Sequence, residues 1–306
     1  MNMTEIFERS NRESRGEWVI TRLIQAAGFS SILFVLMILF FLLANGLPAL
    51  KDVALSNLFS TVWYPIEEYY GILPLILGSL VVTIGAALFG VPVGILTAVY
   101  ISEVAPRWVK EVLKPLIEIL AGIPSVVLGF LGALVLAPFL RESLNLPTGL
   151  TALTGSLLLG AIAIPTIVSI SEDALNTVPR SYREAALALG TTRWQTIWGV
   201  TVPAARSGIL MAVMLGIGRS IGETMTVMMV TGNAPVMPAS FGALFAPIRT
   251  MTATIASEMG EVASGSPHYH VLFFIGIVLF LITLGVNIMA SRIAFRSRKR
   301  SERVLS

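Results

Sequence analysis

Six long runs of apolar residues dominate this sequence and decide what the chain can fold into. Each is close to 20 residues long, about the length that a helix needs to cross the hydrocarbon core of a bilayer. Of the 306 residues, 55% are hydrophobic and 13% are charged, whereas about 25% are charged in an average soluble domain. The sequence therefore predicts an all-α polytopic membrane protein and excludes a soluble enzyme or a disordered chain. We expect the six transmembrane helices at residues 25–47, 73–100, 116–140, 153–170, 208–230 and 271–290.

The polar stretches between these runs suggest a simple organisation. We expect an N-terminal cytoplasmic segment at residues 1–24 and a first transmembrane helix at 25–47. No small-residue cleavage site follows the first apolar run, so we expect that helix to be retained and not removed as a signal peptide. A five-helix core should then occupy residues 70–290, and a basic tail should follow at 291–306.

The basic residues are distributed unevenly among the connecting segments. Of the 21 lysines and arginines, 17 lie in alternate segments counted from the N-terminus, and only Lys51, Arg141 and Arg249 lie in the opposite set. Arg219 is the one basic residue inside a predicted span. Because lysine and arginine accumulate in cytoplasmic loops, both termini should be cytoplasmic. The net charge of +3 is too small to predict nucleic-acid binding.

The sequence carries no recognisable catalytic or metal-binding motif. It has no cysteine and no G-x-x-x-x-G-K-[ST] phosphate loop, so we expect no ATP hydrolysis and no cofactor on this chain. It also has no H-E-x-x-H motif and no recognisable Ser/His/Asp arrangement. His268 and His270 are two residues apart, but no third ligand lies near them, so we expect ordinary polar loop residues and no metal.

The segment between the fourth and fifth spans, residues 171–206, has strong local signals for two short helices. Pro179 suits a helix start, the following residues are strong helix formers, and Gly190 suits the helix end. A second amphipathic run, residues 194–200, should stop before Pro203. Such a compact pair of helices fits a groove on a partner protein. The alternative is a helix pair that lies on the lipid surface.

The fifth span contains the charged residues Arg219 and Glu223. Their spacing of four predicts that they share one face of a helix. A charge at the membrane centre costs at least about 2.5–3.5 kcal/mol, so such residues normally face a cavity or a partner. The planar fork of arginine suits an oxyanion, and Ser220 and Thr224 offer further donors. The alternative is an internal Arg–Glu pair that only locks two helices together.

The third span contains Pro124 and Ser125, surrounded by several glycines. Proline and glycine weaken a membrane helix unless neighbouring groups satisfy the freed backbone, and small residues allow close helix contact. The residues alone leave open whether this segment is a packing kink or part of a solute pathway.

Three segments resemble a known family. Glu184–Ala185–Ala186, three residues, Gly190, nine residues and then Val200-x-Val202–Pro203 resemble the E-A-A-x3-G-x9-I-x-L-P loop of ABC importer permeases, with valine in place of isoleucine and leucine. Residues 122–130 resemble the G-I-P-S-V-V-x-G-F stretch of phosphate ABC permeases, and residues 218–224 resemble their G-R-[AS]-x-G-E-T stretch.

This resemblance to phosphate ABC permeases of the PstC/PstA type, PstC-like in its extra first span, carries several implications. It implies a type I, MetI-like permease fold and a subunit that translocates inorganic phosphate across the cytoplasmic (inner) membrane of a prokaryote. The partners would be a PstA-like second permease subunit, two copies of a cytoplasmic ATPase that binds ATP and Mg, and an extracytoplasmic phosphate-binding protein. Glu184, Ala185, Ala186, Gly190 and Pro203 would form the ATPase-coupling loop, and the substrate pathway would use Arg219, Glu223, Ser220, Thr224, Pro124 and Ser125.

Other functions remain open from the residues alone. One arginine does not choose among tetrahedral anions, so molybdate or sulfate is the first alternative. A proton-coupled secondary carrier with Glu223 as relay would leave the coupling loop unexplained, and a scaffolding subunit would leave Arg219 and Glu223 unexplained. The two sizeable outer segments, residues 47–71 and 231–270, should contact the binding protein. Their aromatic residues suit an interface anchor, or alternatively an aromatic belt at the membrane surface; in the first segment these are Trp63, Tyr64, Tyr69 and Tyr70.

Overall fold

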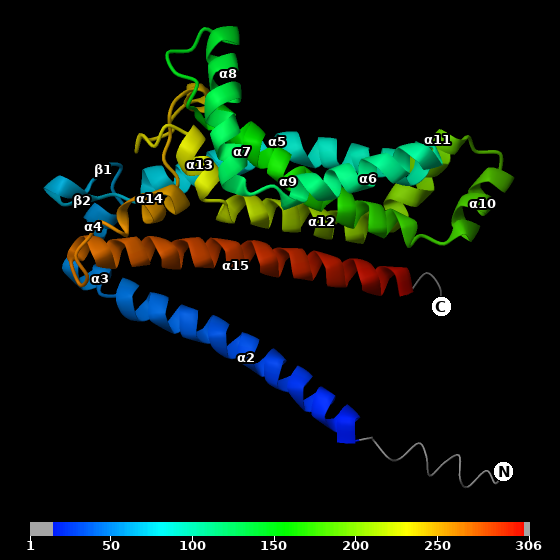
Figure 1. Ribbon diagram of the computed structural model, residues 1–306, viewed down its shortest axis with the longest axis horizontal. Coiled ribbons are helices and arrows are strands. Elements are labelled where there is room, and N and C mark those ends of the chain that lie inside the picture. Colours follow the sequence, from blue (N-terminus) through cyan, green and yellow to red (C-terminus); the bar gives the residue numbers. More distant parts are fainter. Residues whose placement is uncertain (1–14, 303–306) are drawn as a thin grey trace.

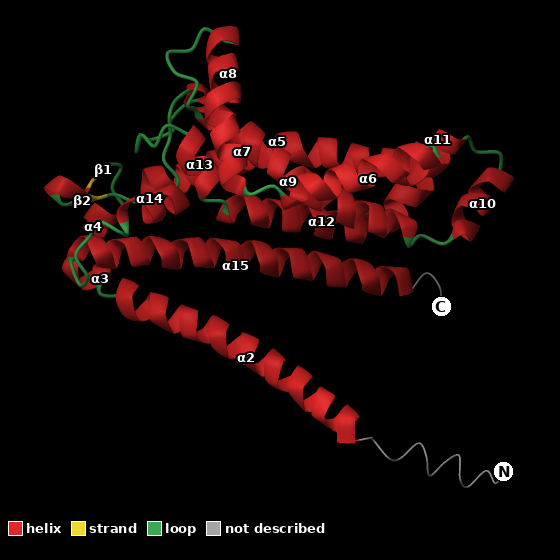
Figure 2. Cartoon of the chain, viewed as in Figure 1, coloured by secondary structure: helices red, strands yellow, loops and turns green. Residues whose placement is uncertain are grey.

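The computed structural model describes residues 15–302. Residues 1–14 of the predicted N-terminal segment and residues 303–306 of the predicted tail lie outside the described residues. Helices account for nearly all the regular structure, and the two strands of the described part are short (Figure 2). The all-α class predicted from composition is therefore confirmed.

The helices follow one another along the chain with short connections. The α-helices are α2 (Arg15–Gly46), α3 (Ala49–Asp52), α4 (Leu55–Leu58), α5 (Leu73–Val99), α6 (Arg107–Gly122), α7 (Ser125–Leu131), α8 (Ala137–Ser143), α9 (Ala152–Asn176), α10 (Arg180–Ala188), α11 (Arg193–Thr196), α12 (Val202–Gly222), α13 (Met225–Val230), α14 (Met251–Glu258) and α15 (Pro267–Glu302). The π-helical turns are η2 (Tyr100–Val104), η3 (Gly132–Leu136) and η4 (Ile197–Thr201), and the 3₁₀ turns are η1 (Pro65–Glu67) and η5 (Phe241–Phe245).

Six stretches of the described residues are helical, long and apolar enough to cross a membrane. They are Glu17–Asp52, Leu73–Val104, Ser125–Ser143, Ala152–Asn176, Arg193–Gly222 and Pro267–Met289. The predicted number of six spans is confirmed. The start of α2 and the end of α15 lie at the same end of the molecule as α10 and α11, and the strands lie at the opposite end (Figure 1). This arrangement is what an even number of crossings requires.

Helix α9 forms the centre of the bundle. In its most apolar window 56% of the residues are buried, against none in the corresponding window of α2. Helix α5 packs closely on α9 because glycines meet: a Cβ on Gly90 would lie 2.8 Å from the carbonyl oxygen of Gly160. Small residues are the usual means of bringing membrane helices together. Helix α12 packs on α9 through Gly216, where a Cβ would lie 2.6 Å from Ile167.

Helix α2 diverges from this bundle towards its N-terminus (Figure 1). It contacts α15 near its other end, where the ring centroids of Phe41 and Phe273 lie 5.4 Å apart. Along the rest of its length its apolar side chains are exposed. A membrane helix of this kind needs lipid or another subunit around it.

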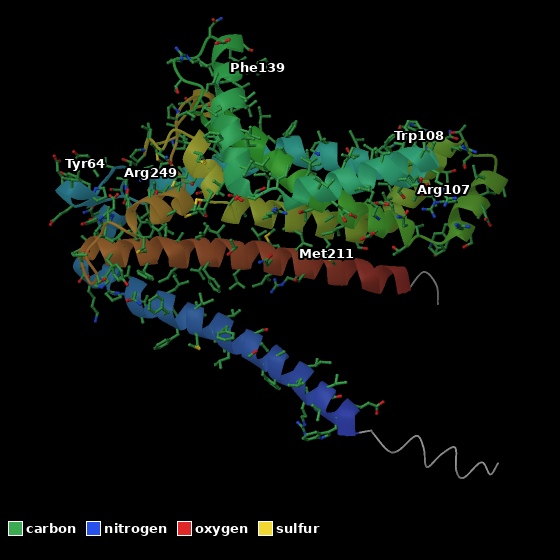
Figure 3. All side chains as sticks on the ribbon, in the orientation of Figure 1. Tyr64, Arg107, Trp108, Phe139, Met211 and Arg249 are labelled. Carbon is green, nitrogen blue, oxygen red and sulfur yellow. The ribbon has the colours of Figure 1, made fainter. Side chains whose placement is uncertain are left out.

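The third span differs from the prediction of one helix over residues 116–140. Helix α6 ends at Gly122, and Ile123 and Pro124 are extended, with ψ of 128° and 134°. Proline disfavours helical geometry in the preceding residue, which explains the break. Beyond it, the run α7–η3–α8 crosses the direction of α5, α9, α12 and α15 (Figure 1). Trp108 on α6 and Phe139 on α8 are exposed apolar side chains of this region (Figure 3).

The segments at residues 47–71 and 231–270 pack together. Helix α14 packs with α3, α4 and the ends of α5 and α15 around a shared apolar cluster. Strands β1 (Trp63–Tyr64) and β2 (Tyr69–Tyr70) pair antiparallel, with Trp63 opposite Tyr70. Because strand residues alternate in direction, Trp63 and Tyr70 are buried in the cluster while Tyr64 and Tyr69 are exposed.

Candidate functional site

The loop between α9 and α12 forms the expected pair of short helices. Helix α10 begins directly after Pro179 and ends at Ala188, as predicted. Gly190 follows with a φ of +83°, the left-handed conformation that ends helices and favours glycine. Thr192 and Gln195 then form a reciprocal capping box at the start of α11.

The second half of this loop differs from the prediction. The helix was expected to stop before Pro203, but α11, η4 and α12 continue as one helical span. Proline has no N–H, and its ring collides with the carbonyl four residues earlier. The π-helical turn η4 lies directly ahead of Pro203, and such a widened turn accommodates the mismatch.

The loop helices pack on each other at Ala186. The side chain of Ala186 is buried, and its carbonyl oxygen accepts the N–H of Thr191 at 3.3 Å and the Thr191 hydroxyl at 2.8 Å. Glu184 and Ala185 are exposed on α10. The structure thus places Glu184 and Ala185 on a free surface and uses Ala186 to fold the loop.

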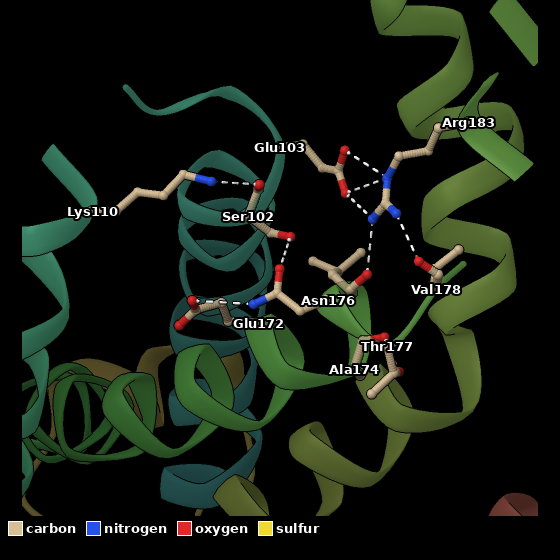
Figure 4. A network of polar contacts seen from close by, with 10 residues as sticks. Ser102, Glu103, Lys110, Glu172, Ala174, Asn176, Thr177, Val178 and Arg183 are labelled. Carbon is tan, nitrogen blue, oxygen red and sulfur yellow. Dashed lines mark hydrogen bonds and ion pairs between the residues drawn. The ribbon is translucent and has the colours of Figure 1, made fainter. Parts of the chain in front are cut away.

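Arg183 connects this loop to the membrane bundle (Figure 4). Its Nη2 lies 2.6 Å from Oε1 of Glu103, and its Nε donates to both oxygens of the same carboxylate at 3.2 and 3.3 Å. Nη2 and Nη1 also donate to the carbonyls of Leu175 and Val178 at 2.9 and 2.7 Å. Neither Arg183 nor Glu103 was expected from the sequence to be functional. They lie 80 residues apart, and no local pattern pairs them.

Further polar contacts surround this ion pair. Ser102 donates to Asn176 at 2.9 Å, and Lys110 donates to the carbonyl of Ser102 at 2.7 Å. Lys114 lies 3.4 Å from Glu172. A cavity of about 590 Å³ opens beside the network, and its lining is Ser102, Glu103, Lys110, Asn176, Val178, Arg180, Arg183 and Glu184.

The fifth span is interrupted beside Arg219. A continuous helix was expected over residues 208–230, but α12 ends at Gly222 and α13 starts at Met225. Glu223 is extended, with a φ of −70° and a ψ of 128°. Arg219 and Glu223 therefore do not share a helical face, which corrects the sequence interpretation. Arg219 Nη1 lies 3.4 Å from the hydroxyl of Thr166 on α9.

The carboxylate of Glu223 caps the helix that follows. Its Oε1 accepts the backbone N–H groups of Thr224 at 3.1 Å and Thr226 at 3.2 Å. The first N–H groups of a helix have no partner within it, and a carboxylate satisfies them well. The side chain of Glu223 therefore stabilises the break in the span.

The helix breaks in the third and fifth spans lie side by side. The hydroxyl of Thr226 donates to the carbonyl of Ser125 at 3.0 Å, and Thr252 donates to the carbonyl of Glu223 at 3.0 Å. Gly129 allows the close approach, because a Cβ there would lie 3.0 Å from Cα of Thr226. Irregular backbone within a membrane protein occurs where it is covered by protein or lines a cavity.

The predicted donors near Arg219 have different surroundings. Ser220 is buried and its hydroxyl donates back to the carbonyl of Gly216 at 3.2 Å. Thr224 donates to the carbonyl of Gly222 at 3.2 Å. Pro124 is exposed, as is Arg219. Ser125 and Glu223 therefore lie at the adjacent helix breaks of the third and fifth spans. The Ser220 hydroxyl, by contrast, is hydrogen-bonded within its own helix.

A second polar cluster lies at the end of the molecule that carries β1 and β2. Oε1 of Glu258 lies 2.8 Å from Nη2 of Arg249 in an ion pair and accepts from the indole of Trp63 at 3.2 Å, and the other oxygen lies 2.8 Å from Nε2 of His268. Burial alone would raise the pKa of Glu258, but the hydrogen bond from His268, the charge of Arg249 and the hydrogen bond from Trp63 hold it below its ordinary value.

His268 and His270 do not gather with a third metal ligand among the described residues. His268 pairs with Glu258, whereas Nδ1 of His270 lies 2.6 Å from Oδ2 of Asp52. Within residues 15–302 no three metal-ligating side chains come together.

Both the sequence and the fold of this chain are similar to those of known proteins. The family model described as "Binding-protein-dependent transport system inner membrane component" matches residues 90–299. The probable ABC transporter permease protein YqgH of Bacillus subtilis (strain 168) is 41% identical, over 94% of this chain and 94% of its own length. The phosphate transport system permease protein PstC of Xylella fastidiosa (strain 9a5c) is 34% identical, over 95% of this chain and 94% of its own length.

Among solved structures, a chain of the MetNI methionine ABC transporter superimposes with a TM-score of 0.53 and 20% identity, covering 74% of this chain and 94% of that one. This likeness confirms the predicted MetI-like fold. At that identity it carries no information about what is transported.

Proposed function

This chain belongs to the family of binding-protein-dependent transport system inner membrane components, and we propose that it acts as the PstC-type permease subunit of an ATP-driven importer of inorganic phosphate. It is the multi-pass membrane component of such a system and not its ATPase. The observation that carries the function is the match to a PstC phosphate permease over 95% of this chain.

In this proposal ATP and Mg bind to a separate cytoplasmic ATPase, present in two copies, that docks on α10. Two observations support the docking surface. Glu184 and Ala185 are exposed on α10, and Leu189 at its end is almost fully exposed. An exposed leucine on a short helix beneath a membrane bundle fits a groove on a partner protein. The excess of lysine and arginine in the alternate segments supports placing α10 and both termini in the cytoplasm.

Phosphate would pass along the face of α12 that carries Arg219. Within the described residues Arg219 makes no ion pair, and its one hydrogen bond, to Thr166, is long at 3.4 Å. An arginine facing lipid costs at least about 2.5–3.5 kcal/mol, so its exposed side must meet protein or a water-filled path. We assign this side to the boundary with a second, PstA-like permease subunit, where the guanidinium can donate two parallel hydrogen bonds to an oxyanion.

The role of Glu223 differs from the one expected of a counter-ion. Since its carboxylate holds the N–H groups of Thr224 and Thr226, it leaves Arg219 available to an anion. Pro124 and Ser125 belong to the same region through the Thr226–Ser125 hydrogen bond. In this proposal the adjacent helix breaks of the third and fifth spans shape the pathway, and Arg219 supplies the positive charge that meets the anion.

The extracytoplasmic phosphate-binding protein would dock on the outer end. Of the four aromatic residues considered from the sequence, Trp63 and Tyr70 belong to the core, so Tyr64 and Tyr69 are the exposed anchors. Tyr64 lies at the outer end, far from Trp108 (Figure 3). Exposed tyrosines are well suited to interfaces because they offer large contact area at low entropic cost.

Uptake of radiolabelled phosphate by cells that lack only this gene tests the function. We expect uptake to be lost on deletion and restored by the intact chain. Unlabelled phosphate should compete, and sulfate and molybdate should not. Competition by sulfate or molybdate that is stronger than by phosphate would assign the permease to another oxyanion.

A further inference from the structure

We propose that the ion pair between Arg183 and Glu103 is the element that transmits movement of α10 to the membrane helices α5 and α9. Arg183 is then a positioning residue for coupling, distinct from the exposed residues that face the ATPase. The inference rests on the proposed function, because it requires an ATPase that moves α10.

The pair joins two parts of the chain that have no backbone link nearby. Arg183 lies in α10, whereas Glu103 lies in η2 at the end of α5. Three nitrogen–oxygen contacts of 2.6 to 3.3 Å connect them. The forked guanidinium fixes distance and orientation together, which a single point charge does not.

The Arg183 side chain also closes the end of α9. The carbonyl of Leu175 lies in the last turn of that helix, and the carbonyl of Val178 lies two residues beyond its end at Asn176. The last carbonyls of a helix have no partner in a following turn. A cation at a helix C-terminus is favourable in addition. One side chain on α10 thereby holds the ends of both α5 and α9.

Glu103 is fixed to the bundle independently of α10. The π-helical turn that carries it is tied to α9 through Ser102 and Asn176 and to α6 through Lys110. Beneath it, Ile101, Leu175 and Val178 belong to one buried apolar cluster with Ala98 and Ile209. A shift of α10 therefore acts on a rigid assembly of α5 and α9, not on a free loop.

The other charged side chains of α10 do not duplicate this connection. Arg180 and Glu184 are exposed and form no ion pair within the described residues. The side chains of Arg183 and Glu103 are only 22% and 11% exposed. Removing one member of a shielded ion pair leaves the charge of the other member uncompensated, whereas an exposed ion pair contributes little to stability.

The test compares Arg183→Gln, Glu103→Gln and the double variant. Each is assembled with the second permease subunit, the ATPase and the loaded binding protein in proteoliposomes, and phosphate uptake and ATP hydrolysis are measured in the same vesicles. We expect hydrolysis to continue in both single variants while phosphate taken up per ATP falls about tenfold, within the range typical of coupling between two sites. The double variant should be no worse than the worse single one, because both changes remove one interaction.

Glu103→Gln is the decisive variant, since Glu103 lies outside the coupling loop. If Arg183 only helped the ATPase to dock, Glu103→Gln would take up as much phosphate per ATP hydrolysed as the wild type. That result, or losses that multiply in the double variant, would overturn the inference. Arg107→Gln is the matched control: Arg107 pairs with Glu111 at 3.1 Å on α6, but both side chains are exposed, and phosphate uptake per ATP should not change.

If the glutamine variants fail to assemble, Arg183→Lys and Glu103→Asp decide the matter. Each keeps its charge, but lysine lacks the planar fork of arginine and aspartate is one methylene shorter than glutamate, so we expect uptake per ATP between that of the wild type and the tenfold loss. Wild-type uptake of phosphate per ATP in both variants would overturn the inference. A failure of the proposed function looks different, because the unaltered complex itself would then take up no phosphate with ATP.

Discussion

Glu223 follows Arg219 by four residues, yet its carboxylate binds the backbone N–H groups of Thr224 and Thr226 and not the guanidinium. The helix that carries Arg219 ends at Gly222, so Glu223 lies in the extended connection between two helices. The positive charge is thereby left without an acidic partner among the described residues. The negative charge, in turn, stabilises the break. The two residues thus have separate roles, which can be tested separately.

Glu223→Gln should preserve transport to within a few-fold. The amide oxygen of glutamine can still accept from Thr224 and Thr226, so the start of α13 keeps its cap. Glu223→Ala removes the cap and should cost about 1 kcal/mol of stability, measured as a lower melting temperature of the complex in detergent. Complete loss of uptake in Glu223→Gln would instead support a titrating role for this carboxyl.

Arg219→Lys and Arg219→Gln should both abolish phosphate uptake nearly completely. Lysine keeps the charge but not the planar fork that holds an oxyanion through two hydrogen bonds. The complex should still assemble, because Arg219 makes only one long hydrogen bond within the described chain. Co-purification with the ATPase measures assembly, and radiolabelled uptake measures transport. Normal uptake in Arg219→Gln would place the pathway elsewhere, and failed assembly would make the residue structural.

Gly190→Leu should uncouple ATP hydrolysis from transport. The φ of +83° at Gly190 is strained for leucine, and the turn after α10 must change to accommodate it. Glu184→Lys should act similarly by altering the exposed surface of α10. Gly199→Ala is the matched control, since a Cβ there meets nothing within 4 Å. Wild-type uptake per ATP in Gly190→Leu and Glu184→Lys would contradict the coupling role of the loop.

The polar cluster around Glu258 should give the protein a distinct response to acid. Since the pKa of Glu258 is held below its ordinary value, its contribution to stability is complete above its unfolded pKa of about 4.3. The contribution is lost as the pH falls through the lower folded pKa. The wild-type melting temperature should therefore drop more steeply than that of Glu258→Gln as the pH falls below about 4.3. Parallel melting curves of the two proteins over this range would contradict the assignment.

The spans and the coupling helix could be predicted because their signals are local. Long aliphatic runs identify the six crossings, and Pro179 and Gly190 limit α10 directly. The end of α12 at Gly222 has weaker local signals, because the break is stabilised by the carboxylate cap of Glu223 and by contacts with Thr252 and the third span. Helix propensity alone favoured a helix that continues past Gly222.

The long-range polar contacts could not be predicted. Trp63 and Glu258 are 195 residues apart, and Arg183 and Glu103 are 80 apart. Each of these side chains looks like an ordinary surface or loop residue when only its neighbours in the sequence are known. Only the packing of α5, α9 and the loops brings them together, and a single sequence contains no record of that packing.

The most direct test of the central claim is ATP-driven phosphate uptake by the purified complex. This chain, its second permease subunit, the ATPase and the binding protein would be reconstituted in vesicles, with ATP supplied on the side of α10 and labelled phosphate on the opposite side. We predict accumulation that requires hydrolysable ATP and the binding protein and that persists when proton gradients are collapsed. Accumulation without ATP that follows an imposed proton gradient would contradict the account.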